Sequence, residues 1–156
     1  MKQFCEFITS KIGILKITAS DDAILSIWFS EKAEKDNPNP LTNMCAAQLA
    51  EYFSGLRRTF QLNINPQGTP FQQAVWMELA RIPYAQTRSY KDIAEAVGNP
   101  KAVRAIGQAN KRNPIAIIIP CHRVIQKNGT PGGYNGQPWR KELLLKHEAS
   151  FAQSSL

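Results

Sequence analysis

The sequence predicts an α+β protein in which a small strand-and-helix unit precedes a mainly helical unit. Apolar residues alternate with polar ones in the first third of the 156-residue chain, as is typical of strands. Helix-capping residues, two of them followed by proline, recur after residue 68. The turn-rich stretch Asn65-Pro66-Gln67-Gly68 separates these regions. We therefore predict one domain at residues 1–66 and a second at residues 67–156.

The N-terminal region contains several strand candidates and one helix. Residues 12–17 and 23–29 have the apolar pattern of strands. The polar, proline-broken stretch 31–40 predicts a loop, and the pattern over residues 41–54 predicts a helix. Renewed alternation over residues 59–64 predicts another strand. The apolar face expected for the helix consists of Met44, Leu49, Tyr52 and Phe53.

Three helices are predicted at the start of the second region. Thr69 is expected to cap the first, which has proline at its first position. Ser89 caps the second, over residues 90–97, in a capping-box arrangement with Asp92. Asn99 is expected to cap the third, which Pro100 opens. A helix, a Gly-Asn turn and a second helix indicate a helix-turn-helix, with an ordinary helical hairpin as the alternative.

The apolar run at residues 115–119 leads to the residues best suited to chemistry. A continuous β-branched run predicts a strand buried on both faces. Pro120 ends it, because proline cannot donate a ladder hydrogen bond. Cys121 follows, beside His122 and Arg123. Neighbouring cations or histidine lower the pKa of a thiol, and the thiolate is the nucleophile. The pattern indicates a reactive thiol, with an inert buried cysteine as the alternative.

Positive charge is concentrated in the second half. Residues 1–70 hold seven Lys/Arg and seven Asp/Glu, whereas residues 71–156 hold twelve and five, so the net charge of +7 lies there. Such asymmetry indicates a polyanionic partner, with a basic protein lacking one as the alternative. The longest apolar run, residues 115–119, is far shorter than the ~18 residues of a membrane span. Three cysteines without CxxC spacing, and no apolar signal segment, predict free thiols in a reducing cytoplasm.

The motifs of the second half resemble those of the O6-alkylguanine-DNA alkyltransferase family (methylated-DNA–protein-cysteine methyltransferases). The resemblance covers about half the chain, and its most specific part is Pro120-Cys121-His122-Arg123-Val124. It implies an RNase-H-like N-terminal domain followed by a DNA-binding domain with a helix-turn-helix. Other matching stretches are Thr69-Pro70-Phe71-Gln72, Thr87-Arg88-Ser89-Tyr90, Gly98-Asn99-Pro100, Val103-Arg104-Ala105-Ile106-Gly107, Asn113-Pro114, Gly132-Gly133-Tyr134, Lys141 and His147-Glu148.

The resemblance implies direct-reversal DNA repair by a suicide methyltransferase. Cys121 would take the alkyl group from O6-alkylguanine, and from O4-alkylthymine, in duplex DNA and keep it as a stable thioether. His122 would act through a bound water as the base that makes the thiolate, and Glu148 would orient His122. Tyr90 would donate toward N3 of the departing guanine, and Asn113 would brace the turn that faces Cys121.

The resemblance also implies how DNA is bound. The damaged base is stacked in the duplex, so base flipping must bring it to the cysteine. Arg104, on the second helix of the helix-turn-helix, would fill the vacated space from the minor groove. The base would be held by main-chain groups at Val124 and Asn135, in a loop that includes Tyr134. The remaining expected DNA contacts are Ser89, Tyr90, Lys101, Ala105, Lys111, Arg112 and Arg123.

Two departures from the family pattern concern single positions. Ala85 stands where the family usually has glycine, for which we expect a local loop change, and Asn135 stands where it often has serine. Some relatives bind structural zinc in the N-terminal domain. Here Cys5 and Cys45 are the thiols of that region and no histidine precedes His122, which is too few ligands for a zinc site. We expect no metal, no cofactor and a monomer.

Three alternative functions are weighed against this one. A binding-only relative would recognise alkylated DNA without repairing it, but such relatives lack the acceptor cysteine. A thiol hydrolase built on Cys121, His122 and Glu148 would leave the basic half and Arg104 without a role. A transcription regulator would need a further sensing domain, for which the sequence has no room.

Overall fold

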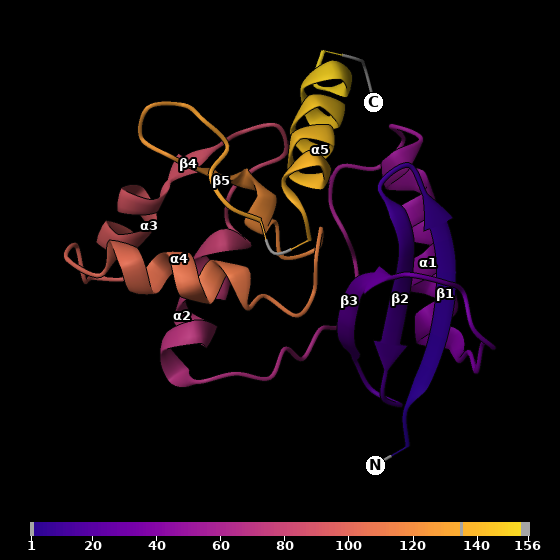
Figure 1. Cartoon of the computed structure of the whole chain (residues 1–156). Coiled ribbons are helices and arrows are strands. Elements are labelled where there is room, and N and C mark those ends of the chain that lie inside the picture. Colours follow the sequence, from indigo (N-terminus) through magenta and orange to yellow (C-terminus); the bar gives the residue numbers. More distant parts are fainter. Residues whose placement is uncertain (1, 135, 154–156) are drawn as a thin grey trace. The chain divides into compact units, whose positions relative to one another are not determined.

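The computed structural model describes residues 2–134 and 136–153 and confirms a mixed α+β protein (Figure 1). Contacts between residues divide the chain after Gln67 into two compact units. We call the described residues up to Gln67 unit 1 and those from Gly68 onward unit 2. In the described chain, no helix is long and apolar enough to cross a membrane.

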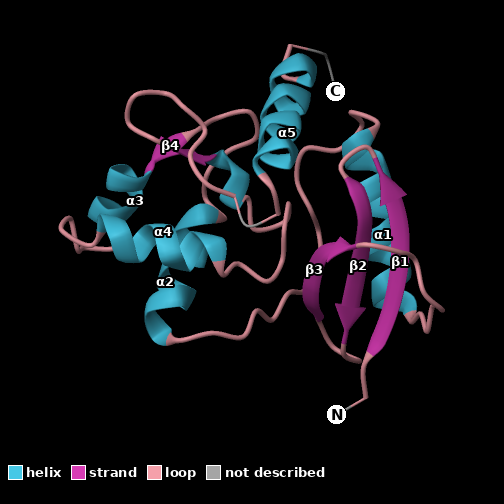
Figure 2. Cartoon of the chain, in the orientation of Figure 1, coloured by secondary structure: helices cyan, strands magenta, loops and turns pink. Residues whose placement is uncertain are grey.

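Unit 1 is a three-stranded antiparallel sheet with one helix packed against it (Figure 2). The strand order is β1-β2-β3, and Ser10 pairs with Gly13 across the tight turn between the first two strands. The sequence pattern does not single out β1, because its residues are half-buried on both faces rather than alternating. The elements are β1 (Phe4–Ser10), β2 (Gly13–Ala19), β3 (Ile24–Ser30) and α1 (Pro40–Phe53).

The helix of unit 1 lies where the sequence predicts, but part of its expected apolar face is wrong. Met44 is 49% exposed. The face turned inward includes polar side chains, because Gln48 hydrogen-bonds the main chain of Gln61 in both directions, at 2.9 and 3.1 Å. The buried residues of α1 are Thr42, Cys45, Gln48, Leu49 and Tyr52.

The strand predicted over residues 59–64 is also wrong. Burial does alternate there, with Phe60, Leu62 and Ile64 turned inward. However, the segment touches the sheet through one isolated bridge, between Ile24 and Ile64. The side chain of Gln48 takes the place of a strand neighbour for Gln61, so an extended segment forms without a ladder.

Unit 2 begins with two helices at their predicted caps. The Thr69 hydroxyl accepts a hydrogen bond from the Gln72 amide at 3.1 Å, and Ser89 accepts one from the Asp92 amide at 3.0 Å. The indole of Trp76 then joins the first helix to the third through the Ala109 carbonyl at 2.9 Å. The elements are α2 (Pro70–Leu79), β4 (Arg88–Ser89), α3 (Tyr90–Ala96), α4 (Val103–Lys111), the 3-10 turn η1 (Cys121–Arg123), β5 (Val124–Ile125) and α5 (Pro138–Phe151).

The third helix of unit 2 begins later than predicted. Asn99 was expected to cap it, but α4 starts at Val103 and has Ala102 at its N-cap without a side-chain hydrogen bond. Gly98, with a φ of 81°, ends α3, and the amide of Asn99 bonds back to Ala94. The Ala102 amide bonds to the Asn99 carbonyl, so residues 99–102 form a turn rather than a helical start. Lys101 therefore lies in the turn before α4.

Residues 115–119 do not form the predicted buried strand. They form a tight turn closed by a bridge between Ala116 and Ile119. Ile117 has a φ of 74°, a left-handed conformation that is rare for a β-branched residue. Asn113 supplies the hydrogen bonds that a ladder would have supplied: its side chain accepts from the Ile115 amide at 3.0 Å and donates to the Ile119 carbonyl at 2.7 Å. The apolar run is buried as a turn because these main-chain groups are satisfied locally.

Candidate active site

Cys121 is presented by a short, well-anchored turn inside unit 2. It is the first residue of η1 and is 1% exposed. Its amide donates to the Ile119 carbonyl at 2.8 Å, and its carbonyl accepts from the side chain of Asn110 at 3.3 Å. Asn113 braces the preceding turn, so the position of Cys121 is fixed from both sides.

The electrostatic surroundings of Cys121 differ from the sequence-based expectation of a lowered pKa. Burial raises the pKa of the thiol, because the thiolate loses its hydration. Asn113, the Lys141 ammonium and the Tyr134 side chain oppose this by favouring the thiolate, but they do not outweigh it. At neutral pH the resting residue is therefore a thiol that must lose its proton to react.

His122, which directly follows Cys121, forms a buried pair with Glu148. His122 is fully buried, and its Nε2 lies 2.7 Å from Oε2 of Glu148. An ionised carboxylate only accepts hydrogen bonds, so Nε2 carries the proton and Nδ1 is the basic nitrogen of the neutral ring. No described residue hydrogen-bonds Nδ1. Glu148 raises the pKa of His122, but burial lowers it more. The lowered pKa keeps the ring neutral at pH 7.

Glu148, on α5, is held by more partners than histidine alone. Arg123 donates from Nε and Nη2 to its two oxygens, at 2.8 and 2.9 Å, and the Ala85 amide donates to Oε1 at 3.1 Å. Burial raises the pKa of the carboxyl, but His122 and Arg123 outweigh it and hold the pKa well below its ordinary value. Ala85 reaches Glu148 from a left-handed backbone conformation, with a φ of 63°.

This placement assigns Arg123 a different role from the expected DNA contact. The guanidinium is buried, and its third hydrogen bond goes from Nη1 to the Ile82 carbonyl at 2.7 Å. It also stacks over the ring of Tyr84, with Cζ 5.6 Å from the centroid. With these groups engaged inside unit 2, Arg123 holds Glu148 in place.

Tyr90 stands beside the thiol at the edge of a cavity. The short parallel pair β4–β5 joins Arg88 to Val124, which brings the start of α3 next to the chain that follows Cys121. Burial raises the pKa of the Tyr90 phenol, and the nearby Cys121 raises it further. The hydroxyl faces Gly132, where an added Cβ would lie 3.0 Å from it. Glycine at this position leaves room for the phenol.

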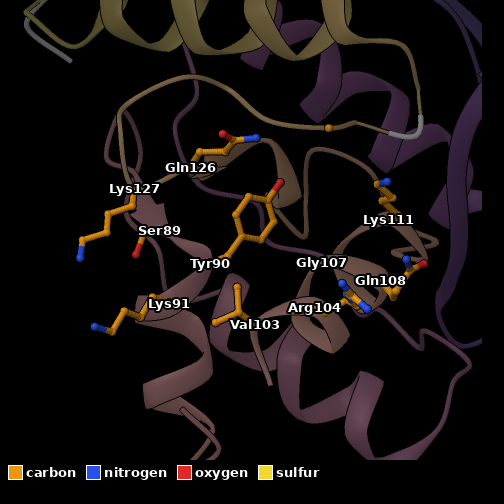
Figure 3. Close-up of a pocket in the computed structure, with 11 residues that line it drawn as sticks. Ser89, Tyr90, Lys91, Val103, Arg104, Gly107, Gln108, Lys111, Gln126 and Lys127 are labelled. Carbon is orange, nitrogen blue, oxygen red and sulfur yellow. The ribbon is translucent and has the colours of Figure 1, made fainter. Parts of the chain in front are cut away.

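The cavity has a volume of about 580 Å³ and a basic lining (Figure 3). Tyr90 lies at the centre of the view, with Lys91 and Lys127 on one side and Arg104 and Lys111 on the other. The cavity thus joins an aromatic hydroxyl to four cationic side chains. It is lined by Ser89, Tyr90, Lys91, Val103, Arg104, Gly107, Gln108, Lys111, Gln126, Lys127 and Gly133.

The expected DNA contacts fall into three places in unit 2. Ser89, Tyr90, Arg104 and Lys111 line this cavity. Ala105 and Arg112 are exposed on α4 and the residue after it, and they line a separate depression with the start of α2. Lys101 is exposed in the turn before α4. Asn135, the expected main-chain contact to the base, lies outside the described residues.

The sequence patterns missed several residues that build the site. Lys91, Gln108, Gln126 and Lys127 line the cavity, although their types alone are common on any surface. Asn110, Lys141 and the role of Arg123 were missed because their partners lie far away in the sequence. Among the described residues, no group of three or more His, Cys, Asp or Glu side chains is placed to hold a metal.

Comparison with known proteins gives matches over nearly the whole chain. Two family models match: "6-O-methylguanine DNA methyltransferase, ribonuclease-like domain" over residues 4–66, and "6-O-methylguanine DNA methyltransferase, DNA binding domain" over residues 70–150. The constitutive methylated-DNA–protein-cysteine methyltransferase of Bacillus subtilis is 49% identical over 148 residues, covering 88% of this chain and 90% of that protein.

Solved structures agree with these matches. The crystal structure of Mycobacterium tuberculosis O6-methylguanine methyltransferase superposes with a TM-score of 0.89 at 39% identity, covering 99% of this chain and 97% of that one. A structure of the M. tuberculosis protein in complex with DNA superposes with a TM-score of 0.85 at 39% identity, covering 94% and 93%.

Proposed function

The chain belongs to the 6-O-methylguanine DNA methyltransferase family, and from this premise we propose that Cys121 is the residue that accepts the alkyl group. Its activity is DNA repair by transfer of an alkyl group from DNA to a cysteine of the protein. The observation that carries the assignment is the buried thiol directly before His122, which pairs with Glu148, together with Tyr90, which lies near the thiol and lines a basic cavity. Burial and Glu6 also raise the pKa of Cys45, to about 12, in unit 1, where the sequence has no histidine to serve as a base.

Proton transfer precedes the displacement in this mechanism. The thiol of Cys121 gives its proton through a bound water to Nδ1 of His122, and Glu148 stabilises the resulting imidazolium through Nε2. The thiolate attacks the alkyl carbon, so a carbon–sulfur bond forms while the bond from that carbon to O6 of guanine breaks. The electron pair of the broken bond stays on the base. The thioether has no further reaction, so each molecule acts once.

Tyr90 supports the departure of the base. Its phenol keeps its proton at neutral pH, because burial and Cys121 raise its pKa. It can therefore donate to N3 of guanine as negative charge develops there. Asn113 fixes the turn before Cys121, and Tyr134 lies beside the thiol. Val124 directly follows the turn that carries Cys121, and its carbonyl accepts a hydrogen bond from Nζ of Lys141.

Duplex DNA containing O6-alkylguanine is the substrate we propose, with O4-alkylthymine as a further one. The cysteine is 1% exposed, so a stacked base cannot reach it and must be flipped out of the helix. Arg104 and Lys111 on α4 border the cavity from one side, where they can contact the opened duplex and its phosphates. Ala105 and Arg112, at the separate depression, and Lys101, in the turn before α4, are proposed as further DNA contacts.

The protein is proposed to act as a monomer in the cytoplasm. Every residue with a proposed part in the reaction lies in unit 2 of a single chain. Cys5, Cys45 and Cys121 are all free, which is typical of a reducing compartment.

Substitution of the cysteine tests the assignment. We expect Cys121→Ala to abolish the loss of O6-methylguanine from duplex DNA while leaving binding to that duplex intact. Cys5→Ser, at a half-buried thiol of unit 1, is the matched control and should repair at the normal rate. Repair by Cys121→Ala at the normal rate would refute the assignment.

A further inference from the structure

Lys141 is a fully buried lysine that the mechanism above does not use. It lies on α5 with an exposed fraction of 0%. Its Nζ donates to the Val124 carbonyl at 2.5 Å and to the Gly133 carbonyl at 3.2 Å. Among the described residues, no carboxylate forms an ion pair with it. A buried cation with only neutral acceptors is costly, so an apolar side chain would fit this interior at lower cost.

The surroundings of this ammonium place it at the reacting thiol. It lies 5.7 Å from the centroid of the Tyr90 ring, the aromatic group beside Cys121. Burial lowers the pKa of Lys141 to about 8, and Cys121 partly offsets this. In return, Lys141 lowers the pKa of Cys121 and of His122. A single cation thus favours the thiolate.

Two carbonyls fix the ammonium at this point. Val124 directly follows the turn that carries Cys121, and Gly133 ends the segment that includes the cavity residues Gln126 and Lys127. Because Nζ donates to both, it cannot swing away from the thiol without breaking two hydrogen bonds. Its position is set by the same backbone that forms the site.

We propose that Lys141 is a positioning residue whose buried positive charge, held by the Val124 and Gly133 carbonyls, stabilises the thiolate of Cys121. The inference rests on the proposed function, in which the thiolate is the nucleophile. It answers a difficulty of that mechanism, because burial opposes ionisation of the thiol. With a pKa of about 8, Lys141 is mostly protonated at pH 7 and supplies a positive charge beside the sulfur at that moment.

Other titratable groups face the thiol from the surrounding elements. They are Tyr90 on α3 and Tyr134 in the loop before α5, and His122 directly follows Cys121 in η1. The pKa values of both tyrosines are raised, so they stay neutral where Lys141 is charged. Arg140, next to Lys141 in the chain, interacts with Tyr134. A test must therefore change Lys141 without changing these groups.

Four variants separate charge from structure. Lys141→Gln keeps a hydrogen-bond donor without charge, Lys141→Met removes both, and Lys141→Arg keeps the charge. Lys146→Gln, at an exposed position of the same helix, changes the net charge equally and is the control. For each protein we would titrate the thiolate absorbance against the matching Cys121→Ser protein. The single-turnover rate of methyl transfer from duplex O6-methylguanine would be measured alongside, with thermal melting to verify folding.

The expected result is a higher thiol pKa where charge is lost. Removal of an opposite charge near a titrating group shifts its pKa by about 1–3 units, so Lys141→Gln and Lys141→Met should raise the Cys121 pKa by at least about 1 unit. Each unit corresponds to about a tenfold loss of thiolate, so transfer should slow by about tenfold or more. Lys141→Arg should recover part of the rate, and Lys146→Gln should behave as the unmodified protein.

Each other outcome has a distinct meaning. If the unmodified protein transfers no methyl group, the proposed function fails before the inference is reached. If transfer occurs but the neutral variants keep the thiol pKa of Lys146→Gln, the inference is overturned. A slower rate with an unchanged thiol pKa also overturns it, because it would show a purely structural role. If Lys141→Met does not fold, Lys141→Gln and Lys141→Arg decide the same question.

Discussion

At the scale of single residues, Glu148 connects most of the catalytic turn. Its two oxygens accept hydrogen bonds from His122, Arg123 and the Ala85 amide, which come from η1 and from the loop before β4. One carboxylate therefore orients the proposed base and neutralises the buried guanidinium behind it. Two of these partners, His122 and Arg123, follow Cys121 directly in the sequence, and Glu148 reaches them from α5.

Loss of that carboxylate should impair both catalysis and folding. We expect Glu148→Gln to slow single-turnover methyl transfer by about 10²-fold or more, in the range of general-base contributions. Its stability to urea should fall by about 3–5 kcal/mol, because Arg123 is left buried without its partner. Glu142→Gln, at an exposed position on the same helix, should change neither quantity. Transfer at the normal rate by folded Glu148→Gln protein would remove Glu148 from the mechanism.

The same residues predict how stability depends on pH. The folded-state pKa of Glu148 is well below its ordinary value of 4.5, so its contribution is present above pH 4.5 and is lost as the pH falls below it. The pKa of His122 is lowered from 6.5, so the unfolded state takes up protons first and stability already falls below pH 6.5. Urea titrations over a pH series should show both losses. Stability that stays constant through this acid range would contradict the assigned shifts.

At the scale of elements, helix α4 is the element through which we propose that DNA binding and base flipping are connected. Its residues Arg104, Gly107, Gln108 and Lys111 line the same cavity as Tyr90, so one face of the helix borders this cavity (Figure 3). In the proposed function, Gly107 on that face would allow the helix to approach the DNA closely. Arg104 lies at the N-terminal end of this face, next to Val103.

Substitution of Arg104 should therefore affect the rate of alkyl transfer and the affinity for DNA to different extents. We expect Arg104→Ala to slow single-turnover transfer more than it weakens binding to undamaged duplex DNA, because its proposed part is to hold the flipped state. Lys101→Ala, in the exposed turn before α4, should weaken salt-dependent binding and leave the transfer rate at saturating protein nearly unchanged. Equal losses of binding and transfer in Arg104→Ala would reduce Arg104 to a phosphate contact.

The loop before β4 carries backbone strain at Ala85. A left-handed conformation costs a non-glycine residue about 1–2 kcal/mol, and glycine loses about 0.4–1 kcal/mol through the unfolded state. We therefore expect Ala85→Gly to raise the stability to urea by up to about 1 kcal/mol. Ala105→Gly, in the right-handed helix α4, should lower it by about 1 kcal/mol. A loss of stability in Ala85→Gly would show that the Glu148 contact depends on the alanine.

Elements that depend on local chemistry are the ones the sequence predicts well. Thr69 and Ser89 accept hydrogen bonds three residues ahead, so the starts of α2 and α3 follow from neighbouring residues. The run at 115–119 is different, because apolar residues are equally buried in a strand or in a turn. The side chain of Asn113 and the left-handed Ile117 decide in favour of the turn.

In the candidate site, too, some residues can be predicted from local sequence and others depend on partners that lie far away in the chain. Cys121, His122 and Glu148 are predictable because the family motif carries them. Arg123 and Lys141 have residue types that usually lie on the surface, and their buried roles arise from carbonyls and carboxylates on other elements. No local pattern encodes such partners, so Arg123 was expected to contact DNA, whereas the fold turns it inward.

At the scale of the whole molecule, charge and chemistry are found in the same part of the chain. Residues 71–156 carry the entire excess of +7, and unit 2 contains the thiol, the His122–Glu148 pair and the basic cavity. The residues that would attract the DNA phosphates and the residues proposed for the covalent step therefore lie in the same unit of the chain. This arrangement suits a protein that must find a rare lesion in a long polyanion and react once.

The most direct test of the central claim is mass spectrometry of the protein after incubation with duplex DNA that carries one O6-methylguanine. The mechanism predicts one added methyl group per protein molecule, saturating at that ratio and located on the peptide that contains Cys121. A methyl group on Cys5 or Cys45 would contradict the assignment of the acceptor. Repair of many lesions by one protein molecule, with no adduct formed, would contradict the mechanism itself.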